Sequence, residues 1–289
     1  MGTFRKSGTE RDLAPGLYVT ATPIGHARDI TLRALDVLSG CDLIAAEDTR
    51  VTAKLLAIHD ISRPLTAYND HNGARERPKL LSRLTHGARI ALVSDAGTPL
   101  VSDPGYKLVR EALAQGVPVH AIPGASATLT ALALAGLPTD RFLFAGFLPS
   151  RAGERGTALA ELKSVRATLI FFESAQRLAE SLAQMAQVLG DRAVAVTREL
   201  TKLHEEVRRG TLTLLSEQYA GETAPRGEVT ILVGPPADGE TDFALLDSLL
   251  DHALPFMPVR AASEMIALAL DMPRKEIYER ALAKKNDEG

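Results

Sequence analysis

The stretch Ser94-Asp95-Ala96-Gly97-Thr98-Pro99-Leu100-Val101-Ser102-Asp103-Pro104-Gly105 is the most informative part of this chain. It follows the apolar run 90–93, which is typical of a buried parallel strand. It precedes 106–114, where apolar residues recur at helical spacing. Twelve residues is long for such a connection, since loops of this kind run about two to six residues. Because open α/β sheets bind ligands beyond the carboxyl ends of their strands, we predict a ligand-binding loop here rather than a plain solvated turn.

Composition restricts the class of protein. The chain has 289 residues, of which 45% are hydrophobic, and this length fits about two domains. Its single cysteine, Cys41, excludes an internal disulfide framework, and no zinc-type spacing of cysteines and histidines occurs, so no metal is expected. No apolar run has the length of a membrane span, and residues 1–15 lack the apolar core of a signal peptide. We therefore expect a flexible N-terminal tail and a cytoplasmic protein without a membrane partner.

The distribution of charge limits the possible nucleic-acid partners. The formal net charge is −3, and residues 240–289 hold ten acidic and six basic residues, a net charge of −4. Aromatic residues make up only 4% of the chain, which does not favour a base-stacking platform. DNA is therefore not an expected partner, and any RNA would be contacted through local patches and shape.

Strand and helix patterns alternate from residue 16 to residue 234, which predicts an α/β fold with parallel strands joined by helices. We expect a flexible tail over 1–15, an N-terminal α/β domain over 16–124, a second α/β domain with a mixed sheet over 125–234, and a linker with a helix-turn-helix-like segment over 235–289. Within these, Asp29 is the expected cap of a helix over 29–38, and 151–156 is an expected loop. The predicted strands are 17–22, 43–46, 65–68, 90–93, 117–122, 142–147, 168–172, 193–197, 204–208 and 228–233.

The usual phosphate-binding loops are missing. No two glycines are separated by a single residue, so the fingerprint G-x-G-x-x-G is absent, and no Gly-Lys pair exists to form a Walker A motif. The predicted ligand is therefore held by a different kind of loop.

Four further motifs accompany the 94–105 loop. They are A-T-P-I-G at 21–25, A-E-D-T-R at 46–50, I-P-G-A-S at 122–126 and G-L-P-T-D-R-F at 136–142. With these motifs the chain closely resembles the tetrapyrrole methylase-like (class III) S-adenosylmethionine methyltransferases. Within that family it is similar to the bacterial 16S ribosomal RNA (cytidine-2′-O)-methyltransferases, and the resemblance covers residues 16–234.

The resemblance implies two α/β domains with S-adenosylmethionine in the cleft between them. This cofactor carries no phosphate, which agrees with the missing phosphate loops. Asp95 would receive its ammonium or ribose hydroxyls, although capping of the following turn is an alternative role. The implied cofactor-binding residues are Pro23, Gly25, Asp95, Ala96, Gly97, Thr98, Pro123, Gly124, Ser126, Phe147 and Leu148, with backbone from 229–232.

The resemblance also implies an activity and a partner. The expected reaction is methylation of the ribose 2′-oxygen of a cytidine in the decoding region of 16S ribosomal RNA, on the assembled small subunit and by a homodimer. Two alternatives are methylation of a small tetrapyrrole by the same fold and a non-catalytic ribosome-binding protein. Methyl transfer to a small-subunit particle would separate them.

Candidates for the catalytic and RNA-binding roles follow from residue type. Glu47, Asp48 and His71 are candidate bases, and Glu173 is a further candidate base or orienting group. In the alternative interpretation, Glu47 and Asp48 form an ion pair with Arg50 and cap a helix. His71 is then an exposed loop residue without a catalytic role. Candidate phosphate contacts are Arg50, Arg141, Arg151, Arg155, Arg177 and Arg198 with Lys202, each of which is an ordinary surface charge in the alternative interpretation.

Some positions depart from the family pattern. His26 stands where the family is expected to have Asn, Leu100 where it has Gly, and Ala125 where it has Pro. Segments 69–72, 151–156 and 174–177 differ on the expected RNA side. The exact substrate is therefore specified less well than the cofactor.

Overall fold

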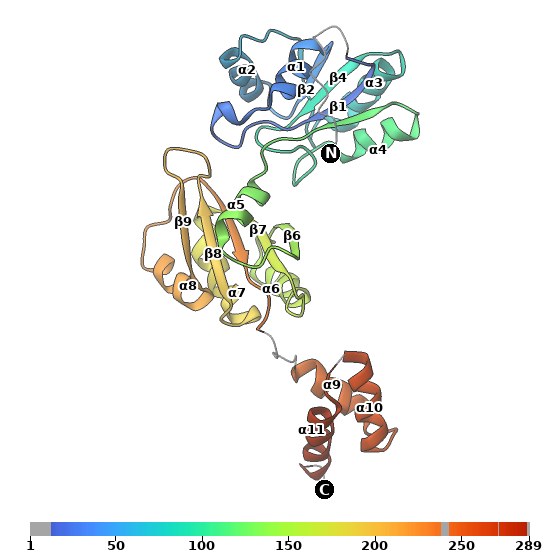
Figure 1. The fold of residues 1–289 in the computed structure, drawn as a ribbon, viewed down its shortest axis with the longest axis vertical. Coiled ribbons are helices and arrows are strands. Elements are labelled where there is room, and N and C mark those ends of the chain that lie inside the picture. The colour runs from blue at the N-terminus through green and yellow to red at the C-terminus, as the bar shows by residue number, and fades with distance from the viewer. Residues whose placement is uncertain (1–12, 238–242, 271, 288–289) are drawn as a thin grey trace, which may run out of the picture. The chain divides into compact units, whose positions relative to one another are not determined.

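The structure is a computed structural model that describes residues 13–237, 243–270 and 272–287. The chain divides into two compact units, one ending at Pro235 and the other beginning at Pro236, and each is described by itself (Figure 1).

The first unit begins with a parallel sheet in the order β3-β2-β4-β1-β5. The three inner strands, β2, β4 and β1, are buried because helices cover both faces of the sheet. Leu17 packs with α3 and α4, whereas its neighbour Tyr18 packs with α1 and α2 on the opposite face. The elements are β1 (Gly16–Thr20), a 3-10 turn η2 (Ala27–Asp29), α1 (Leu32–Gly40), β2 (Leu43–Ala46), α2 (Thr49–Ile58), β3 (Leu65–Ala67), α3 (Gly73–Thr85), β4 (Arg89–Val93), α4 (Tyr106–Ala114) and β5 (Val119–Ile122).

The second sheet of this unit is mixed, as predicted, in the order β6-β7-β10-β8-β9. Only β6 and β7 run parallel, and the remaining pairs are antiparallel. One face packs on three helices through Phe171, Leu182 and Ile231. The elements are β6 (Phe142–Phe147), α6 (Ala152–Glu161), β7 (Thr168–Ser174), a 3-10 turn η3 (Ala175–Arg177), α7 (Leu178–Leu189), β8 (Ala193–Arg198), β9 (Glu206–Thr211), α8 (Leu212–Ala220) and β10 (Glu228–Val233).

Helix α5 (Ala127–Ala135) covers the other face of this second sheet and lies at its junction with the first (Figure 1). Ala131, Ile170 and Leu232 form a core cluster there, and the same cluster contains Ile24, from the loop after β1, and Leu200, from the loop after β8. The two sheets therefore share buried side chains close to the loops that follow β1 and β5.

Four local predictions are wrong. The cap of α1 is Thr31, whose side chain accepts from the amide of Ala34, while Asp29 lies in the preceding 3-10 turn. The first strand ends at Thr20 rather than at residue 22, and β9 begins at Glu206 rather than at 204. The expected loop over 151–156 opens helix α6, because Arg155 and Leu159, four positions apart, are both buried. Packing of that face overrides the low helix propensity of the two glycines in the segment.

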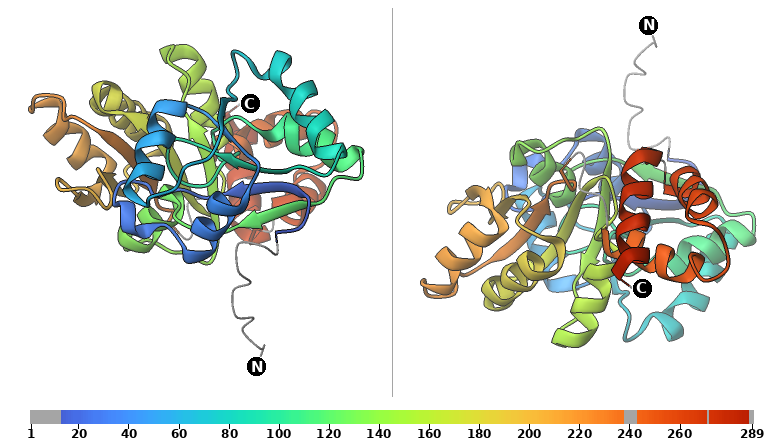
Figure 2. Two further views of the ribbon diagram at one scale, coloured as in Figure 1. Left: turned by 90° about the horizontal axis from the view of Figure 1, so that it is seen from above. Right: turned by 90° about the horizontal axis from the view of Figure 1, so that it is seen from below.

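The second unit is a bundle of three helices, α9 (Phe243–Ala253), α10 (Val259–Leu270) and α11 (Arg274–Asp287), drawn in red in Figure 2. Leu250, Ile266 and Ile277 belong to its core, and Arg280 pairs with Asp247 at 2.6 Å. Its ranges agree with the predicted helical segment, although Asp271, between α10 and α11, lies outside the described residues. The predicted tail up to residue 12 also lies outside them, and the domain boundary after residue 124 stays a prediction. No helix within the described ranges is long and apolar enough to cross a membrane.

Candidate functional site

Loops at the carboxyl edge of the first sheet are tied to one another by hydrogen bonds. Thr22, after β1, exchanges two backbone hydrogen bonds with Gly97, at 2.8 and 3.1 Å. Thr98 Oγ1 donates to the carbonyl of Ala125, after β5, at 3.1 Å. The 94–105 loop is thus fixed at the centre of the edge, as expected for a loop that follows a central strand.

Two acidic side chains join the ends of β2 and β4. The amide of Asp95 donates to Glu47 Oε2 at 3.2 Å, and the amide of Asp48 donates to Asp95 Oδ1 at 2.9 Å. Asp95 therefore supports the backbone with one carboxylate oxygen. The structural role observed for Asp95 is therefore a bond to the loop after β2, not the predicted alternative of capping the turn that follows it.

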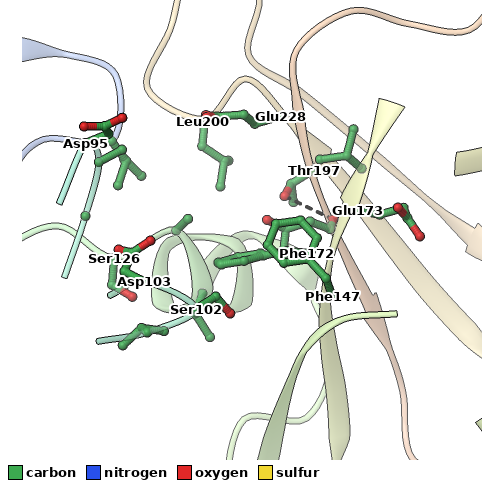
Figure 3. Close-up of a pocket in the computed structure, with 18 of the residues that line it drawn as sticks. Asp95, Ser102, Asp103, Ser126, Phe147, Phe172, Glu173, Thr197, Leu200 and Glu228 are labelled. Carbon is green, nitrogen blue, oxygen red and sulfur yellow. Dashed lines mark hydrogen bonds between the residues drawn. The ribbon is translucent and has the colours of Figure 1, made fainter. Parts of the chain in front are cut away.

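A cavity of about 440 Å³ lies beside these loops. Its walls come from the 94–105 loop, the start of α5, strands β6, β7 and β10, and the segment after β8 (Figure 3). The lining residues are Ile24, Glu47, Asp95, Ala96, Gly97, Thr98, Val101, Ser102, Asp103, Ser126, Ala127, Thr128, Phe147, Phe172, Glu173, Ser174, Ala175, Gln176, Thr197, Leu200, Gly227, Glu228, Val229 and Thr230.

Phenylalanine rings form one wall of the cavity. Phe147 and Phe172 meet edge to face with their centroids 5.6 Å apart, and 59% of Phe147 is exposed. The start of α5 also lines the cavity, where Ser126 caps the helix and the buried hydroxyl of Thr128 has no hydrogen-bond partner. A buried hydroxyl without a partner is costly, so a polar group of a ligand at this wall would be favourable.

Three carboxyl groups of the lining have raised pKa values. Burial raises the pKa of Asp103 to about 6, and the neighbouring charges of Glu47 and Asp95 add to the effect. Burial also raises the pKa values of Glu47 and Asp95. Carboxyl groups with pKa values nearer to neutrality are better proton acceptors for catalysis at physiological pH.

The loop backbone is strained near Asp103. Leu100 and Ser102 have φ values of +78° and +63°, in the left-handed region that favours glycine. The expected family residue at position 100 is Gly, and this φ value explains that preference. Strain of this kind persists only where the surrounding structure fixes it.

The structure brings together six of the eleven predicted cofactor residues in the cavity wall: Asp95, Ala96, Gly97, Thr98, Ser126 and Phe147. Pro23, Gly25, Pro123, Gly124 and Leu148 do not line it. Gly25 instead allows a close approach of the 200–202 segment, because a Cβ there would lie 2.6 Å from Lys202 Cγ and 2.9 Å from the carbonyl oxygen of Leu200. Leu148 belongs to the apolar core of the second sheet.

Of the candidate bases, Glu47 lines the cavity, whereas Asp48 and His71 do not. The Arg50 guanidinium beside Asp48 lowers the pKa of that carboxyl to about 2, which makes it a poor proton acceptor. His71 lies on an exposed turn, where its amide donates to Asn69.

Glu173 reaches the cavity wall, but its carboxylate is turned away (Figure 3). It accepts from Arg177 Nη2 at 2.6 Å and from Ser181 Oγ at 2.6 Å, and its side chain is fully buried. Its partners hold it in a structural ion pair, so its carboxylate does not face the cavity.

The predicted RNA-contacting residues divide by exposure. Arg50 and Arg151 expose 86% and 82% of their side chains, and Arg141 is also exposed. Arg177 and Arg198 expose only 25% and 21%, and both are engaged with carboxylates. Lys202 pairs with Glu199 and Glu228.

The prediction that Arg155 contacts RNA is wrong. Its side chain is buried in the second sheet's helical layer, where it contacts Glu180, Gln184 Oε1 and the carbonyl of Ser150. A buried guanidinium cannot meet a phosphate at the surface. Arg155 is therefore a structural residue of the α6–α7 contact.

Sequence reasoning missed several lining residues. Asp103 belongs to the quoted 94–105 loop, so its place in that loop was the available signal. Phe172 and Thr197 lie within strands, where nothing in the pattern distinguishes a residue facing a cavity from one facing a core. Val229 and Thr230, from the predicted 229–232 segment, also line the cavity.

Comparison with known proteins identifies the family. The model of Tetrapyrrole (Corrin/Porphyrin) Methylases matches residues 16–215. The chain is 50% identical over 280 residues to ribosomal RNA small subunit methyltransferase I of Mesorhizobium japonicum, covering 96% of this chain and 95% of that protein. This chain belongs to the tetrapyrrole methylase family. Its relatives within the family place it with the small-subunit ribosomal RNA methyltransferases, so it is a methyltransferase whose cofactor is S-adenosylmethionine.

Solved structures agree on the fold. A diphthine synthase superposes with a TM-score of 0.60 at 17% identity, covering 75% of this chain and 89% of that one. Uroporphyrin-III C-methyltransferase from Thermus thermophilus, complexed with S-adenosylhomocysteine, superposes with a TM-score of 0.52 at 20% identity, covering 75% and 96%. The α/β fold with two sheets is thus confirmed.

The cavity suits this cofactor chemically. S-adenosylmethionine offers two cationic groups, which carboxylates attract, and an adenine ring, which an aromatic wall accommodates. Thr128 supplies a hydroxyl that has no other partner. Within the described residues no group of three or more His, Cys, Asp or Glu side chains could hold a metal ion.

Proposed function

We propose that this methyltransferase acts on the ribose 2′-oxygen of a cytidine in the decoding region of 16S ribosomal RNA, within the assembled small subunit. The observation that carries the proposal is the 50% identity, over nearly the whole chain, to a ribosomal RNA small subunit methyltransferase. The cavity supports it with carboxylates suited to a cationic donor and to a proton from a hydroxyl group.

The bound cofactor supplies an electrophilic methyl group on a sulfonium. The chain's own residues then have two tasks, to orient the ribose and to remove its proton. Glu47 and Asp103 are the proposed proton acceptors, because they line the cavity and burial raises their pKa values. Such a base contributes about 10²–10⁴-fold to a rate.

Exposed arginines are the proposed RNA contacts. Arg50 follows β2 at the edge that carries Glu47, and Arg141 and Arg151 flank strand β6, which supplies Phe147. Their guanidinium groups suit bidentate phosphate contact. Because the net charge of the chain is −3, we expect these few contacts to depend on the shape of an assembled particle rather than on naked RNA.

The proposal includes a homodimer in the cytoplasm. Large apolar side chains remain exposed on the first unit, among them Leu203 at 93% and Leu32 at 80%. Such side chains provide surface for contact between copies. Light scattering at micromolar concentration tests the dimer, and a monomer mass would count against it.

The reaction is tested on small subunits purified from cells that lack the gene for this chain. We expect the purified protein to transfer a labelled methyl group to these particles and to yield 2′-O-methylcytidine after nuclease digestion. Methylation on a base, or equal turnover on a short free oligonucleotide, would contradict the proposal. Glu47→Gln and Asp103→Asn should slow transfer, and comparison with His71→Ala separates cavity residues from the candidate outside it.

A further inference from the structure

The charges that line the cavity are all of one sign. Five carboxylates line it, and among the described lining residues there is no Lys, Arg or His. Two of the five are neutralised from outside the cavity. Glu173 pairs with Arg177, and Glu228 pairs with Lys202 at 2.8 Å.

The other three, Glu47, Asp95 and Asp103, form no ion pair with a basic side chain in the part of the chain that the structure describes. Glu47 and Asp95 accept only from backbone amides, and Asp103 accepts from the hydroxyl of Ser94. Arg50 acts on Asp95 from a distance, but its guanidinium is bound to Asp48. The cavity therefore holds an excess of negative charge that a cation would offset.

The methyl donor and its product differ in this respect. S-adenosylmethionine has a positively charged sulfur, and S-adenosylhomocysteine has a neutral one, while both keep the same ammonium and carboxylate. The attraction between unit charges in a partly buried site is several-fold stronger than in water. A group of uncompensated carboxylates therefore distinguishes these two ligands by charge alone.

We propose that Glu47, Asp95 and Asp103 form a charge-selective site that favours the cationic methyl donor over its neutral-sulfur product. This inference rests on the proposed function for the identity of the ligand. During transfer the methyl group moves from sulfur to the ribose oxygen, the ribose proton passes to a carboxylate and then to water, and the sulfur loses its charge. The product then lacks the attraction that held the donor, which aids its release.

Calorimetric affinities test the proposal without measuring turnover. Dissociation constants are measured for S-adenosylmethionine, for S-adenosylhomocysteine and for sinefungin, whose amine places a positive charge where the product has none. In the unchanged protein we expect sinefungin and the donor to bind more tightly than the product. Glu47→Gln and Asp103→Asn should each weaken donor and sinefungin binding about tenfold and product binding less than about twofold.

Glu154→Gln is the matched control. It removes a carboxylate of the same unit that is exposed on α6 and does not line the cavity, so the ratio of donor to product affinity should stay constant. Thermal melts of each variant show whether it is folded before its affinities are compared.

The outcomes separate the two proposals. If neither cofactor form binds the unchanged protein, the proposed function fails at its cofactor. If all three ligands bind and Asp103→Asn and Glu47→Gln lower their affinities equally, the carboxylates hold the shared ammonium and the charge-selective site is refuted. Sinefungin that follows the product rather than the donor would refute it as well.

Discussion

Replacement of Arg155 tests the assignment that changed most between sequence and structure. The buried guanidinium donates to Glu180, to Gln184 Oε1 and to the carbonyl of Ser150 at 3.3 Å. Arg155→Ala removes all three contacts and leaves a space beneath α7. Truncating a large, fully buried side chain costs about 2–5 kcal/mol through the space that it leaves. Because the Glu180 left behind is 62% exposed and stays hydrated, no buried charge is left unpaired, and we expect a loss of about 3 kcal/mol.

Such a loss lowers the melting temperature by about 6–12 °C, at about 2–4 °C for each kcal/mol in a protein of this size class. Arg151→Ala is the matched control, because Arg151 lies on the same helix end with 82% of its side chain exposed, and it should change stability by less than about 0.5 kcal/mol. Circular dichroism melts give both values, and binding to small-subunit particles is measured in parallel. Equal melting temperatures for the two variants, with particle binding lost only in Arg155→Ala, would refute this reasoning and return Arg155 to the RNA surface.

Other substitutions probe packing and charge. Gly25→Ala should lower the free energy of unfolding in urea by about 1–3 kcal/mol, since its Cβ would lie 2.6 Å from Lys202 Cγ. In the control Gly153→Ala, in α6, the new Cβ meets nothing within 4 Å, and the free energy of unfolding should rise by up to about 1 kcal/mol. Similar effects of the two substitutions would count against the close approach at Gly25. The pKa of Asp103 is raised to about 6 in the folded state, so stability is lost as pH rises from about 4 to about 6. Asp103→Asn should therefore raise the free energy of unfolding at pH 7.5 by about 1–2 kcal/mol, after allowance for solvent screening, and should not raise it at pH 4. Thermal melts at the two pH values measure this, and an equal gain at both would contradict it. Glu173→Ala should cost about 3–5 kcal/mol because it strands a partly buried arginine, and a thermally unchanged variant would argue against the ion pair.

Regular elements could be predicted where local pattern determines them. The bounds of α4, β6 and β10 agree with the predicted ranges, because each is an unbroken apolar or helical pattern ended by turn residues. The start of α6 was missed because its glycines suggested a loop, while the burial that stabilises it depends on Glu180, distant in sequence.

In the site, too, the positions set by sheet topology could be predicted, whereas those set by contacts between distant residues could not. Loops that follow parallel strands were predictably gathered at one edge, so the positions of Asp95 and Ser126 in the cavity wall followed from topology. The packing of Gly25 against Lys202 depends on a contact across 177 positions, which no local spacing reveals. The same holds for the direction in which the carboxylate of Glu173 points, because Ser181 on the following helix fixes it.

The strand order of the second sheet has a consequence for synthesis of the chain. β10 is the last of the sheet's strands along the sequence, yet it lies in the middle, between β7 and β8. Until residue 233 has been made, β7 and β8 each present an unpaired edge, and exposed edges promote aggregation. The same strand carries Val229 and Thr230, which line the cavity. A nascent chain therefore gains protection of its sheet and a complete cavity wall in one late step, and a chain truncated before β10 would have neither.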